Sequence, residues 1–537
     1  MKIPNHVENI LSELEKNGYQ AYLVGGCVRD ILMERTPFDW DVTTNAQPEE
    51  IQKIFVDSVY ENDFGTVGVK VVTSDKGQET KEIVEVTPFR KEASYTDKRH
   101  PDKVIFTEKV EDDLARRDFT VNAMAMGLKH EARNSKHETI SKSKNSNNKN
   151  VLGLEHSNLK FVSNFDIRIS DFILVDPFDG QKDIKAKLIR AVGKPEDRFS
   201  EDALRMMRAV RFAAQLGFSA QGGPASGWDI ETETKSAIKL LANNLKAISH
   251  ERVRDELTKL IGSNDPEKGI LLMQELGLLK IVLPEVEEGM GVTQNKHHIY
   301  NVFEHSVKSL GFAAKYNFNI YVRFASLLHD IGKPRSKQGE GADANFHGHE
   351  FVGAKMAARA LERLKFPKDF IEKVYTLVRY HMFYYNVGEV TDKSVRRLVR
   401  KVGPENMQEL LEVRQAERKG SGVPKAEPYR LRHLKFMIEK VSRDPLTVGM
   451  LKINGDDVMQ ALTIEPGPKV GYILNALLEE VIDDPERNKK ENLLERIKEL
   501  NNLSGEELVK LAEAGKEKLE EEREKEDEGI KEKYYVK

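Results

Sequence analysis

The stretch "YLVGGCVRDILMERTPFDWDVTT", residues 22–44, joins a strand pattern, a glycine pair, a helix pattern and two aspartates. Asp39 and Asp41 are two positions apart, and side chains at that spacing in a β-strand point to the same face. Neighbouring carboxylates repel each other unless a cation lies between them, and a hard ion such as Mg²⁺ is the usual partner. Taken alone, the pair is also explained by a solvated strand end followed by an Asx or Thr turn.

The residues before the aspartates have the components of a phosphate-binding site. Gly25 and Gly26 form a predicted turn between a buried type of strand and a helix that carries Arg29. Glycines let backbone N–H groups approach an anion closely, the start of a helix adds partial positive charge, and an arginine adds a full one. We therefore predict a triphosphate at this turn, beside metal ions held by the two aspartates.

The bulk composition limits the class of protein. With 537 residues, the chain is long enough for three or four domains of roughly 100 to 200 residues each. The mean hydropathy is −0.54 and no apolar run approaches the roughly 18 residues of a membrane span, so we expect a soluble protein with no membrane segment. Cys27 is the only cysteine, which excludes an intrachain disulfide and fits a reducing cytoplasm. Because the net charge is −4, any contact with nucleic acid must come from local basic patches.

The pattern changes along the chain from mixed to helical. Residues 19–127 contain apolar and alternating runs typical of strands, and from about residue 180 apolar residues recur at helical spacing. Between them, "NSKHETISKSKNSNNKN", residues 134–150, lacks large apolar groups and is predicted to be a disordered insertion. We therefore expect an α/β head followed by an all-α remainder.

Several motifs together identify a family resemblance. "GGCVRD" followed by "DWDVTT" resembles the signature of the polymerase β superfamily, in particular the class II tRNA nucleotidyltransferase and poly(A) polymerase family. "RRDFTVNAMAM" (116–126), "DPFDG" (176–180) and "EDALRMMRAVRF" (201–212) resemble its next three motifs, and "ISHERVRDELTKLI" (248–261) resembles its neck helix. The resemblance covers roughly residues 19–290.

The resemblance implies roles for the first aspartates and for the second motif. Asp39 and Asp41 would hold two Mg²⁺ ions during in-line displacement of pyrophosphate. Arg117 would contact phosphate, and Asp118 and Asn122 would hydrogen-bond the ribose hydroxyls. A helix-capping ion pair is the alternative for Arg117 and Asp118. A strand residue, Glu85, is either a third carboxylate of the site or an exposed side chain.

The fourth motif is predicted to read the incoming base. Asp202, Arg205 and Arg208 are three apart and would line one face of a helix. In the resembling family, the Asp and Arg of E-D-x-x-R pair with the Watson–Crick edge. An acceptor beside a guanidinium donor suits C and A and rejects G and U. A surface salt bridge explains the spacing equally well.

A second group of polar residues lies in the helical part. Histidines and aspartates spread over separate segments suit one or two divalent ions, and imidazole with carboxylate fits Mn²⁺, Ni²⁺, Zn²⁺ or Fe²⁺. The segment with "HDIGK" resembles the HD phosphohydrolase superfamily over about residues 297–400, which implies hydrolysis of 2′,3′-cyclic or 3′-phosphate ends. A domain that only supports the fold is the alternative. The candidate ligands are His305, His329, Asp330, His349, His381 and Asp392, with His347 nearby.

The resemblance also implies a domain order and boundaries. The predicted fold class is an α/β nucleotidyltransferase head followed by an all-α neck, body and tail. The predicted ranges are 1–178 for the head with an insertion at about 130–165, 179–262 for the base-reading neck, 263–400 for the HD body, 401–505 for a tRNA-binding tail and 506–537 for a charged helix or frayed tail.

The function implied is template-independent addition or repair of the 3′-terminal CCA of tRNA from CTP and ATP in the cytoplasm. The polar segment 89–106 corresponds to a flexible loop that accompanies A addition in the family, and "SVRRLVRKVG" (394–403) is the best basic candidate for tRNA contact. Two alternatives stay open: a poly(A) polymerase, for which a strongly basic C-terminus would be expected, and a metal-dependent HD phosphohydrolase with an RNA-binding head. The sequence does not indicate an oligomeric state.

Overall fold

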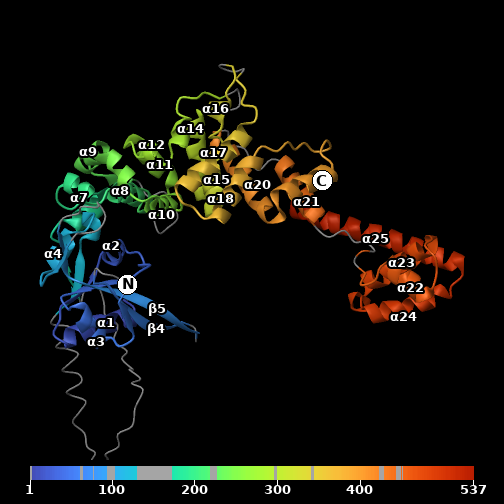
Figure 1. Ribbon diagram of the computed structural model, residues 1–537, viewed down its shortest axis with the longest axis horizontal. Coiled ribbons are helices and arrows are strands. Elements are labelled where there is room, and N and C mark those ends of the chain that lie inside the picture. Colours follow the sequence, from blue (N-terminus) through green and yellow to red (C-terminus); the bar gives the residue numbers. More distant parts are fainter. Residues whose placement is uncertain are drawn as a thin grey trace, which may run out of the picture. The chain divides into compact units, whose positions relative to one another are not determined.

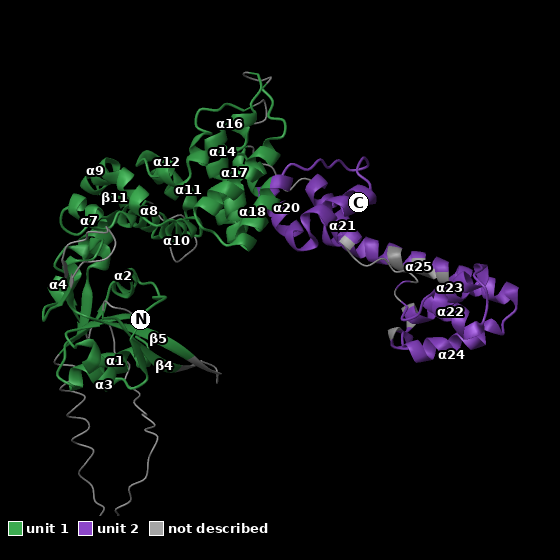
Figure 2. Ribbon diagram, viewed as in Figure 1, with its two compact units in different colours: residues 1–378, 416–422 green, residues 379–415, 423–537 purple. Residues whose placement is uncertain are grey.

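A computed structural model divides the chain into two compact units (Figure 2). Unit 1 comprises residues 1–378 and 416–422, and unit 2 comprises residues 379–415 and 423–537. None of the helices among the described residues is long and apolar enough to cross a membrane. The predicted fold class, an α/β head followed by a mostly helical chain, is confirmed. The residues that the structure describes are 3–60, 65–75, 78–93, 103–129, 172–217, 227–294, 299–339, 344–422, 429–442, 449 and 451–536.

Unit 1 begins with a mixed seven-stranded sheet in the order β3-β4-β5-β2-β1-β8-β9. Figure 1 shows β4 and β5 of this sheet beside α1 and α3. The pair β2 and β5 is parallel, and the other neighbouring pairs are antiparallel. Strands β6 and β7 form a separate antiparallel pair. The elements of the head are α1 (Asn5–Lys16), β1 (Ala21–Val24), α2 (Gly26–Leu32), β2 (Asp41–Thr44), α3 (Pro48–Ile54), β3 (Ser58–Tyr60), β4 (Val67–Asp75), β5 (Gln78–Pro88), β6 (Arg90–Ala93), β7 (Lys103–Phe106), α4 (Val110–Ala115), the 3₁₀ turn η1 (Thr120–Asn122), β8 (Ala125–Leu128) and β9 (Phe172–Val175).

The two faces of this sheet differ in chemistry. Leu23, Val42 and Val86 pack with α1 and α3 into one apolar core. Because side chains alternate along a strand, Asp41 and Glu85 point to the opposite face, where they are register partners across β2 and β5. A slip of β2 by one residue would bury Asp41 in the core, so the apolar face fixes the position of the acid.

The rest of unit 1 is helical apart from one short pair of strands. Helix α8 packs against α10 and α11, and α11 packs against α14. The buried side chains of α8, among them Met206, Met207 and Val210, recur at the spacing that the sequence predicted. The elements are α6 (Gly180–Ala186), β10 (Leu188–Ile189), α7 (Pro195–Glu201), α8 (Leu204–Gln215), β11 (Asp229–Ile230), α9 (Thr232–Leu241), η3 (Ala242–Ala247), α10 (His250–Ile261), α11 (Pro266–Glu275), α12 (Leu279–Val282), α13 (Pro284–Glu287), α14 (Val302–Lys315), α15 (Ile320–Leu328), α16 (Lys333–Ser336), α17 (His349–Arg363) and α18 (Lys368–Tyr380).

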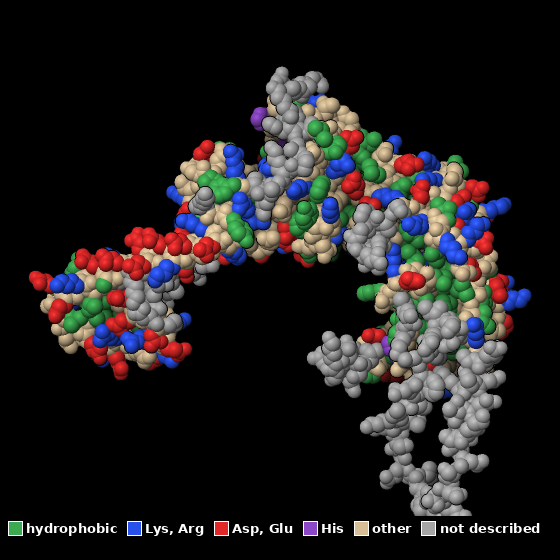
Figure 3. All heavy atoms as spheres, turned by 180° about the vertical axis from the view of Figure 1, so that it is seen from behind, with side chains coloured by type: hydrophobic (Ala, Val, Ile, Leu, Met, Phe, Trp, Pro, Cys, Tyr) green, Lys and Arg blue, Asp and Glu red, His purple; other side chains and the backbone are tan. Residues whose placement is uncertain are grey.

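Unit 2 is all-helical in its described residues. Its largest apolar cluster joins α22, α23 and α24, and the long α25 packs against α23 and α21. The predicted charged segment, residues 506–537, forms a helix over most of its length. Acidic side chains line the surface of this helix, α25 (Figure 3). The elements are α19 (Asp392–Val402), η5 (Pro404–Asn406), α20 (Met407–Gly420), whose last residues are counted with unit 1, α21 (Tyr429–Ser442), α22 (Gly455–Leu462), α23 (Pro468–Asp483), η7 (Pro485–Arg487), α24 (Lys490–Asn501) and α25 (Gly505–Lys533).

One predicted segment falls wholly outside the described residues, and another falls partly outside them. The insertion expected at about 130–165 lies wholly within residues 130–171, which the structure does not describe. In the polar segment 89–106, the ends pair as β6 and β7, with Arg90 opposite Phe106. Residues 94–102 between them lie outside the description.

We predict that the single thiol reports on the folding of the head. Burial raises the pKa of Cys27 from 9.0 to about 11. Below pH 9 the thiol is neutral in both states, whereas between pH 9 and 11 only the unfolded chain loses its proton, so the free energy of unfolding falls as pH rises, by up to about 1.4 kcal/mol per pH unit for this group. Urea titrations at several pH values should show this slope, and Cys27→Ala should reduce it. A native thiol that reacts with Ellman's reagent at pH 8 as fast as the unfolded chain would contradict the burial.

Candidate functional site

The two aspartates flank the start of β2. The strand begins at Asp41, and Asp39 lies in the bend before it. The prediction that both belong to one strand is therefore wrong, because the chain turns at Phe38 and Asp39 before it pairs with β1. Asp39 is exposed, whereas Asp41 is half-buried.

The electrostatic environment of Asp41 fits a cation site. Burial raises the pKa of Asp41, and the charge of Asp39 raises it further, while Arg117 lowers it. Glu85 stands beside Asp41 on the neighbouring strand and is exposed. Asp39, Asp41 and Glu85 thus offer three carboxylates near the start of β2, and an oxygen-only donor set is what a hard ion such as Mg²⁺ prefers.

The glycine turn makes a close approach to this acid. Gly25 has φ +79°, and a Cβ at this position would lie 2.9 Å from Arg117 Nη1 and 3.7 Å from Asp41 Oδ2. The guanidinium of Arg117 therefore lies against both the turn and the acid. Its Nη2 also donates to Asp113 at 3.2 Å, so Arg117 forms an ion pair with Asp113, whereas Asp118 pairs with Arg208.

Arg29 does not face the turn as a free cation. Its side chain is 8% exposed, its Nε donates to Asp30 at 2.9 Å, and its Nη1 donates to Asn122 at 2.7 Å. The carboxylate of Asp30 and the side-chain amide of Asn122 hold the guanidinium of Arg29 between α2 and η1. A direct contact of Arg29 with phosphate stays a prediction.

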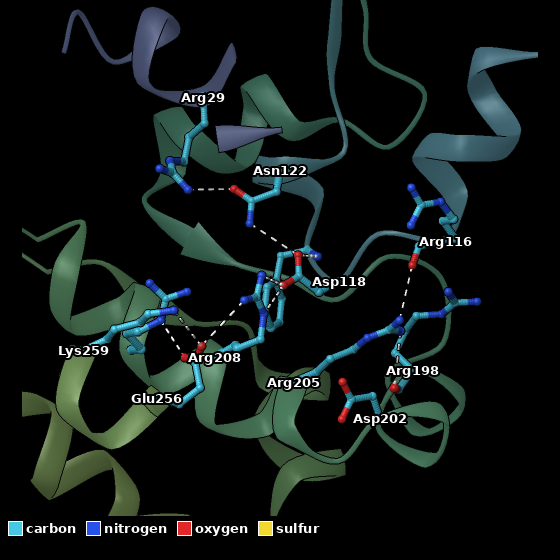
Figure 4. Close-up of polar contacts among 12 residues, drawn as sticks. Arg29, Arg116, Asp118, Asn122, Arg198, Asp202, Arg205, Arg208, Glu256 and Lys259 are labelled. Atoms are coloured by element: carbon cyan, nitrogen blue, oxygen red, sulfur yellow. Dashed lines mark hydrogen bonds and ion pairs between the residues drawn. The ribbon is translucent and has the colours of Figure 1, made fainter. Parts of the chain in front are cut away.

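A buried polar network continues from Asn122 to the helical neck (Figure 4). Asn122 Nδ2 donates to Asp118 Oδ1 at 3.3 Å, and Arg208 donates to Asp118 Oδ2 from Nε at 2.7 Å and from Nη2 at 2.6 Å. Burial would raise the pKa of Asp118, but Arg208 outweighs it and lowers that pKa. Arg208 Nη1 also lies 3.7 Å from Glu256 on α10. The network joins the turn of the head to α8 and α10.

The predicted base-reading residues do not share one helical face. Helix α8 begins at Leu204, and Asp202 lies before it in an extended conformation, so only Arg205 and Arg208 have helical spacing. The carboxylate of Asp202 accepts from the Leu204 N–H at 3.0 Å, so the acid is bonded to the first residue of α8 from outside the helix, while Ala203 holds the N-cap position.

Both base-reading groups have partners that the sequence did not single out. Arg252 of α10 donates to Asp202 from Nη2 at 2.6 Å and from Nη1 at 3.3 Å. Arg205 donates to Glu201 at 2.7 Å and reaches the carbonyls of Arg116 and Arg198 (Figure 4). The only sequence signal for Arg252 was its place in the neck-helix motif, because its partner is 50 residues away.

The HD residues of unit 1 converge as predicted. His305 Nε2 lies 3.1 Å from His329 Nε2 and 3.5 Å from Asp330 Oδ2, and His329 Nε2 lies 3.2 Å from the same oxygen. His349 Nε2 lies 3.4 Å from Asp330 Oδ1. Ligand atoms of one ion bound at about 2.0–2.2 Å lie roughly 2.9–3.6 Å apart, so these distances fit a shared metal.

The outer contacts of the histidines orient them for metal binding. The Nδ1 atoms of His329 and His349 each lie 2.8 Å from a backbone carbonyl, of Ser326 and Phe346 respectively. A carbonyl can only accept, so each Nδ1 carries the proton and each Nε2 can offer a lone pair. His347 is exposed, and His381 and Asp392 belong to unit 2.

The charges of this cluster are strongly coupled. Burial would raise the pKa of Asp330, but His329 and Lys333 hold it well below its usual range. Burial alone would lower the pKa of His329, yet Asp330 raises it. Burial and the neighbouring His329 lower the pKa of His305 to about 3. Lys333 is a further member of the site that the sequence analysis did not select, although it stands within "HDIGK".

Comparison with known families matches three parts of the chain. The model described as poly A polymerase head domain matches residues 21–138, the one described as probable RNA and SrmB-binding site of polymerase A matches residues 227–290, and the HD domain model matches residues 302–416. A head and an HD domain of these kinds imply the use of divalent metal ions.

Individual relatives match over most of the chain. The A-adding tRNA nucleotidyltransferase of Deinococcus radiodurans is 33% identical over 382 residues, which cover 69% of this chain and 75% of that protein. The CCA-adding enzyme of Ligilactobacillus salivarius is 30% identical over 496 residues, or 91% of this chain and 95% of that protein. The crystal structure of Bacillus stearothermophilus CCA-adding enzyme in complex with CTP is similar with a TM-score of 0.52 and 26% identity, over 93% of this chain and 98% of that one.

We predict that Gly25→Ala damages the turn more than backbone strain alone would. The new Cβ would displace the Arg117 guanidinium from Asp41, and the backbone at φ +79° and ψ −129° adds about 1–3 kcal/mol of strain for a residue with a Cβ. We expect the affinity for a nucleoside triphosphate to fall by at least about tenfold, since a small misplacement of a charged group has a large effect. Gly193→Ala is the matched control, because Gly193 has φ +70° and open space around its Cβ position. Equal effects of the two changes on binding would contradict the close approach.

Proposed function

Because this chain belongs to the family of tRNA nucleotidyltransferases and poly(A) polymerases, we propose that it extends the 3′ end of tRNA without a template. It would add or repair the terminal CCA from CTP and ATP and release pyrophosphate. The observation that carries the proposal is the contact of the Gly25 turn, Arg117 and Asp41 at the open end of β2. The glycine turn lets a phosphate approach the backbone, the guanidinium adds positive charge, and the half-buried acid can hold a metal ion. Together they suit a triphosphate with its metal.

The carboxylates would act by holding Mg²⁺. Asp39 and Asp41 would bind it, and Glu85 is placed to join them. When bound, Mg²⁺ lowers the pKa of the RNA 3′-hydroxyl and stabilises charge on the leaving pyrophosphate. The 3′-oxygen would form a bond to the α-phosphorus, the bond to the bridging oxygen of the pyrophosphate would break, and the hydroxyl proton would pass to solvent. Arg117 would orient the triphosphate.

Selection of the incoming base would require Asp202 and Arg205 to release the partners that they contact in the structure. An Asp202 carboxylate accepts from the exocyclic amine of C or A, and Arg205 donates to a ring acceptor. In the structure the two groups hold Arg252 and Glu201 instead. Arg208 would support the ribose-binding pair by fixing Asp118. We infer that the base replaces part of these internal contacts when it binds.

The relatives leave open which nucleotides are added, because one is an A-adding and the other a CCA-adding enzyme. The segment that pairs as β6 and β7 supports an activity that includes A addition. In unit 2, helix α19 exposes Arg396, Arg397 and Arg400, which favours it as a phosphate-contacting part of the tRNA-binding tail.

A second activity is favoured by the geometry of the HD cluster. The oriented Nε2 atoms and Asp330 would hold a divalent ion, of which Mn²⁺, Ni²⁺, Zn²⁺ and Fe²⁺ suit the donors. When bound, such an ion supplies a nucleophilic water for a phosphoester. We propose that it removes 2′,3′-cyclic or 3′-phosphate groups from RNA ends, which would prepare them for extension.

We predict that Asp39→Ala and Asp41→Ala each lower nucleotide incorporation by at least about a thousandfold, because each removes a ligand of the ion that stabilises both reacting oxygens. Incorporation should be measured on tRNA transcripts that end before CCA, before CA and before A, with CTP and ATP offered singly and together. Asp57→Ala removes an exposed carboxylate of the same domain, 3.5 Å from Lys70, and should leave the rate unchanged. Extension of an unstructured RNA as fast as tRNA would instead favour a poly(A) polymerase.

We predict that the two activities separate by mutation. His329→Ala should abolish hydrolysis of a 2′,3′-cyclic nucleotide in the presence of Mn²⁺ or Ni²⁺, since it removes a buried ligand, and should leave CMP and AMP incorporation intact. Asp41→Ala should show the opposite pattern. If the wild-type protein hydrolyses neither a 2′,3′-cyclic nor a 3′-phosphate end with any of the metals above, the proposed second activity is wrong.

A further inference from the structure

An ammonium group stands inside the HD cluster. Lys333, the first residue of α16, is 7% exposed, and its Nζ lies 2.6 Å from Asp330 Oδ2 and 2.6 Å from Gln294 Oε1. The ring of Phe346 is 5.7 Å from Nζ. Gln294 is also buried, and its Nε2 donates to the Tyr300 carbonyl at 3.2 Å. Lysine is almost never buried unless paired, and these groups supply the partners that one buried positive charge needs.

The same carboxylate oxygen is central to the candidate metal site. Asp330 Oδ2 lies 2.6 Å from Lys333 Nζ, and it also lies 3.2 and 3.5 Å from the Nε2 atoms of His329 and His305. A divalent ion bound between the imidazoles and this oxygen would share it with the ammonium. Two cations on one buried oxygen repel strongly, because little water is present to screen them.

We propose that Lys333 is a resident counter-cation that competes with the divalent metal for Asp330. The inference rests on the proposed HD metal site. Without metal, the ammonium neutralises the buried carboxylate. With metal, the ammonium must leave Oδ2, so the resident charge lowers the apparent metal affinity. The HD site then fills only at a free metal concentration high enough to displace the ammonium. The proposed metal site of the head has oxygen ligands only, and no lysine contacts Asp39 or Asp41 among the described residues.

A purely structural role for Lys333 makes a different prediction. If the ammonium only anchors α16, its loss destabilises the body and leaves metal affinity unchanged or weaker. If it competes, its loss destabilises the metal-free protein because a buried carboxylate has lost its cation, and it strengthens metal binding for the same reason. The direction of the change in metal affinity therefore distinguishes the two roles.

The test is calorimetric titration of Mn²⁺ into the full chain after chelator treatment, in an Asp39→Ala/Asp41→Ala background that removes the proposed head site. Lys333→Met should bind Mn²⁺ at least about tenfold more tightly than the background protein. Its melting temperature should be lower without metal and should rise more on adding Mn²⁺. Lys333→Gln keeps a hydrogen-bonding group without the charge and should also bind Mn²⁺ more tightly than the background protein. It replaces Lys333→Met in the test if that variant does not fold. His329→Ala should remove the heat and so assign it to this site.

Lys315→Met is the matched control, because it removes one exposed positive charge from the end of α14 and should leave Mn²⁺ affinity unchanged. Equal or weaker Mn²⁺ binding by the folded Lys333 variants would overturn the competition while leaving the metal site in place. Absence of Mn²⁺ binding in the background protein and in both Lys333 variants would overturn the metal site and, with it, this inference. Neither result bears on nucleotide incorporation, which is measured separately in the wild-type chain.

Discussion

The half-buried carboxylate of Asp41 is the constraint on which the head depends. Val42, its neighbour in β2, packs into the apolar core, so the register that buries Val42 also turns Asp41 to the other face. There the acid meets Asp39 before the strand, Glu85 beside it and the Gly25 turn with Arg117. Burial and like charge both raise the pKa of Asp41, and a cation relieves both effects. The hydrophobic effect therefore positions a group that electrostatics alone would expel.

The same reasoning explains how the helical neck is attached to the head. Asp118 is a buried acid of the head, and Arg208 of α8 is its strongest partner. Removing one member of such a pair leaves a buried charge uncompensated, which typically costs about 3–5 kcal/mol. Asn122 and Glu256 extend the pair toward Arg29 and toward α10. The placement of α8 beside the Gly25 turn is thus fixed by directional contacts as well as by apolar packing.

Much of this arrangement could be predicted from local sequence, and the remainder could not, for identifiable reasons. The strand, turn and helix around Gly25 follow from apolar alternation and glycine chemistry, which act over a few residues. The HD histidines were found because their residue types suit one ion. The spacing of three between Asp202 and Arg205 fitted a helical face, but it equally fits an acid that lies just before the next helix and accepts from its first N–H. Partners such as Arg252 are tens of residues from the groups they hold, and no local pattern identifies them.

Each of the two sites places a protein cation beside an acid, and the difference between them is physical. In the head, Arg117 is also held by Asp113, so its charge is shared with a second carboxylate and it lies to one side of Asp41. In the HD cluster, Lys333 is bonded directly to the oxygen that faces two imidazoles, and its only other acceptor is the neutral Gln294 among the contacts described. The arginine therefore leaves an acidic edge to which a hard ion can bind, while the lysine neutralises its acid. Since both acids are buried or half-buried, the affinity of each proposed site for metal would be set by how much of its negative charge the neighbouring cation has already compensated.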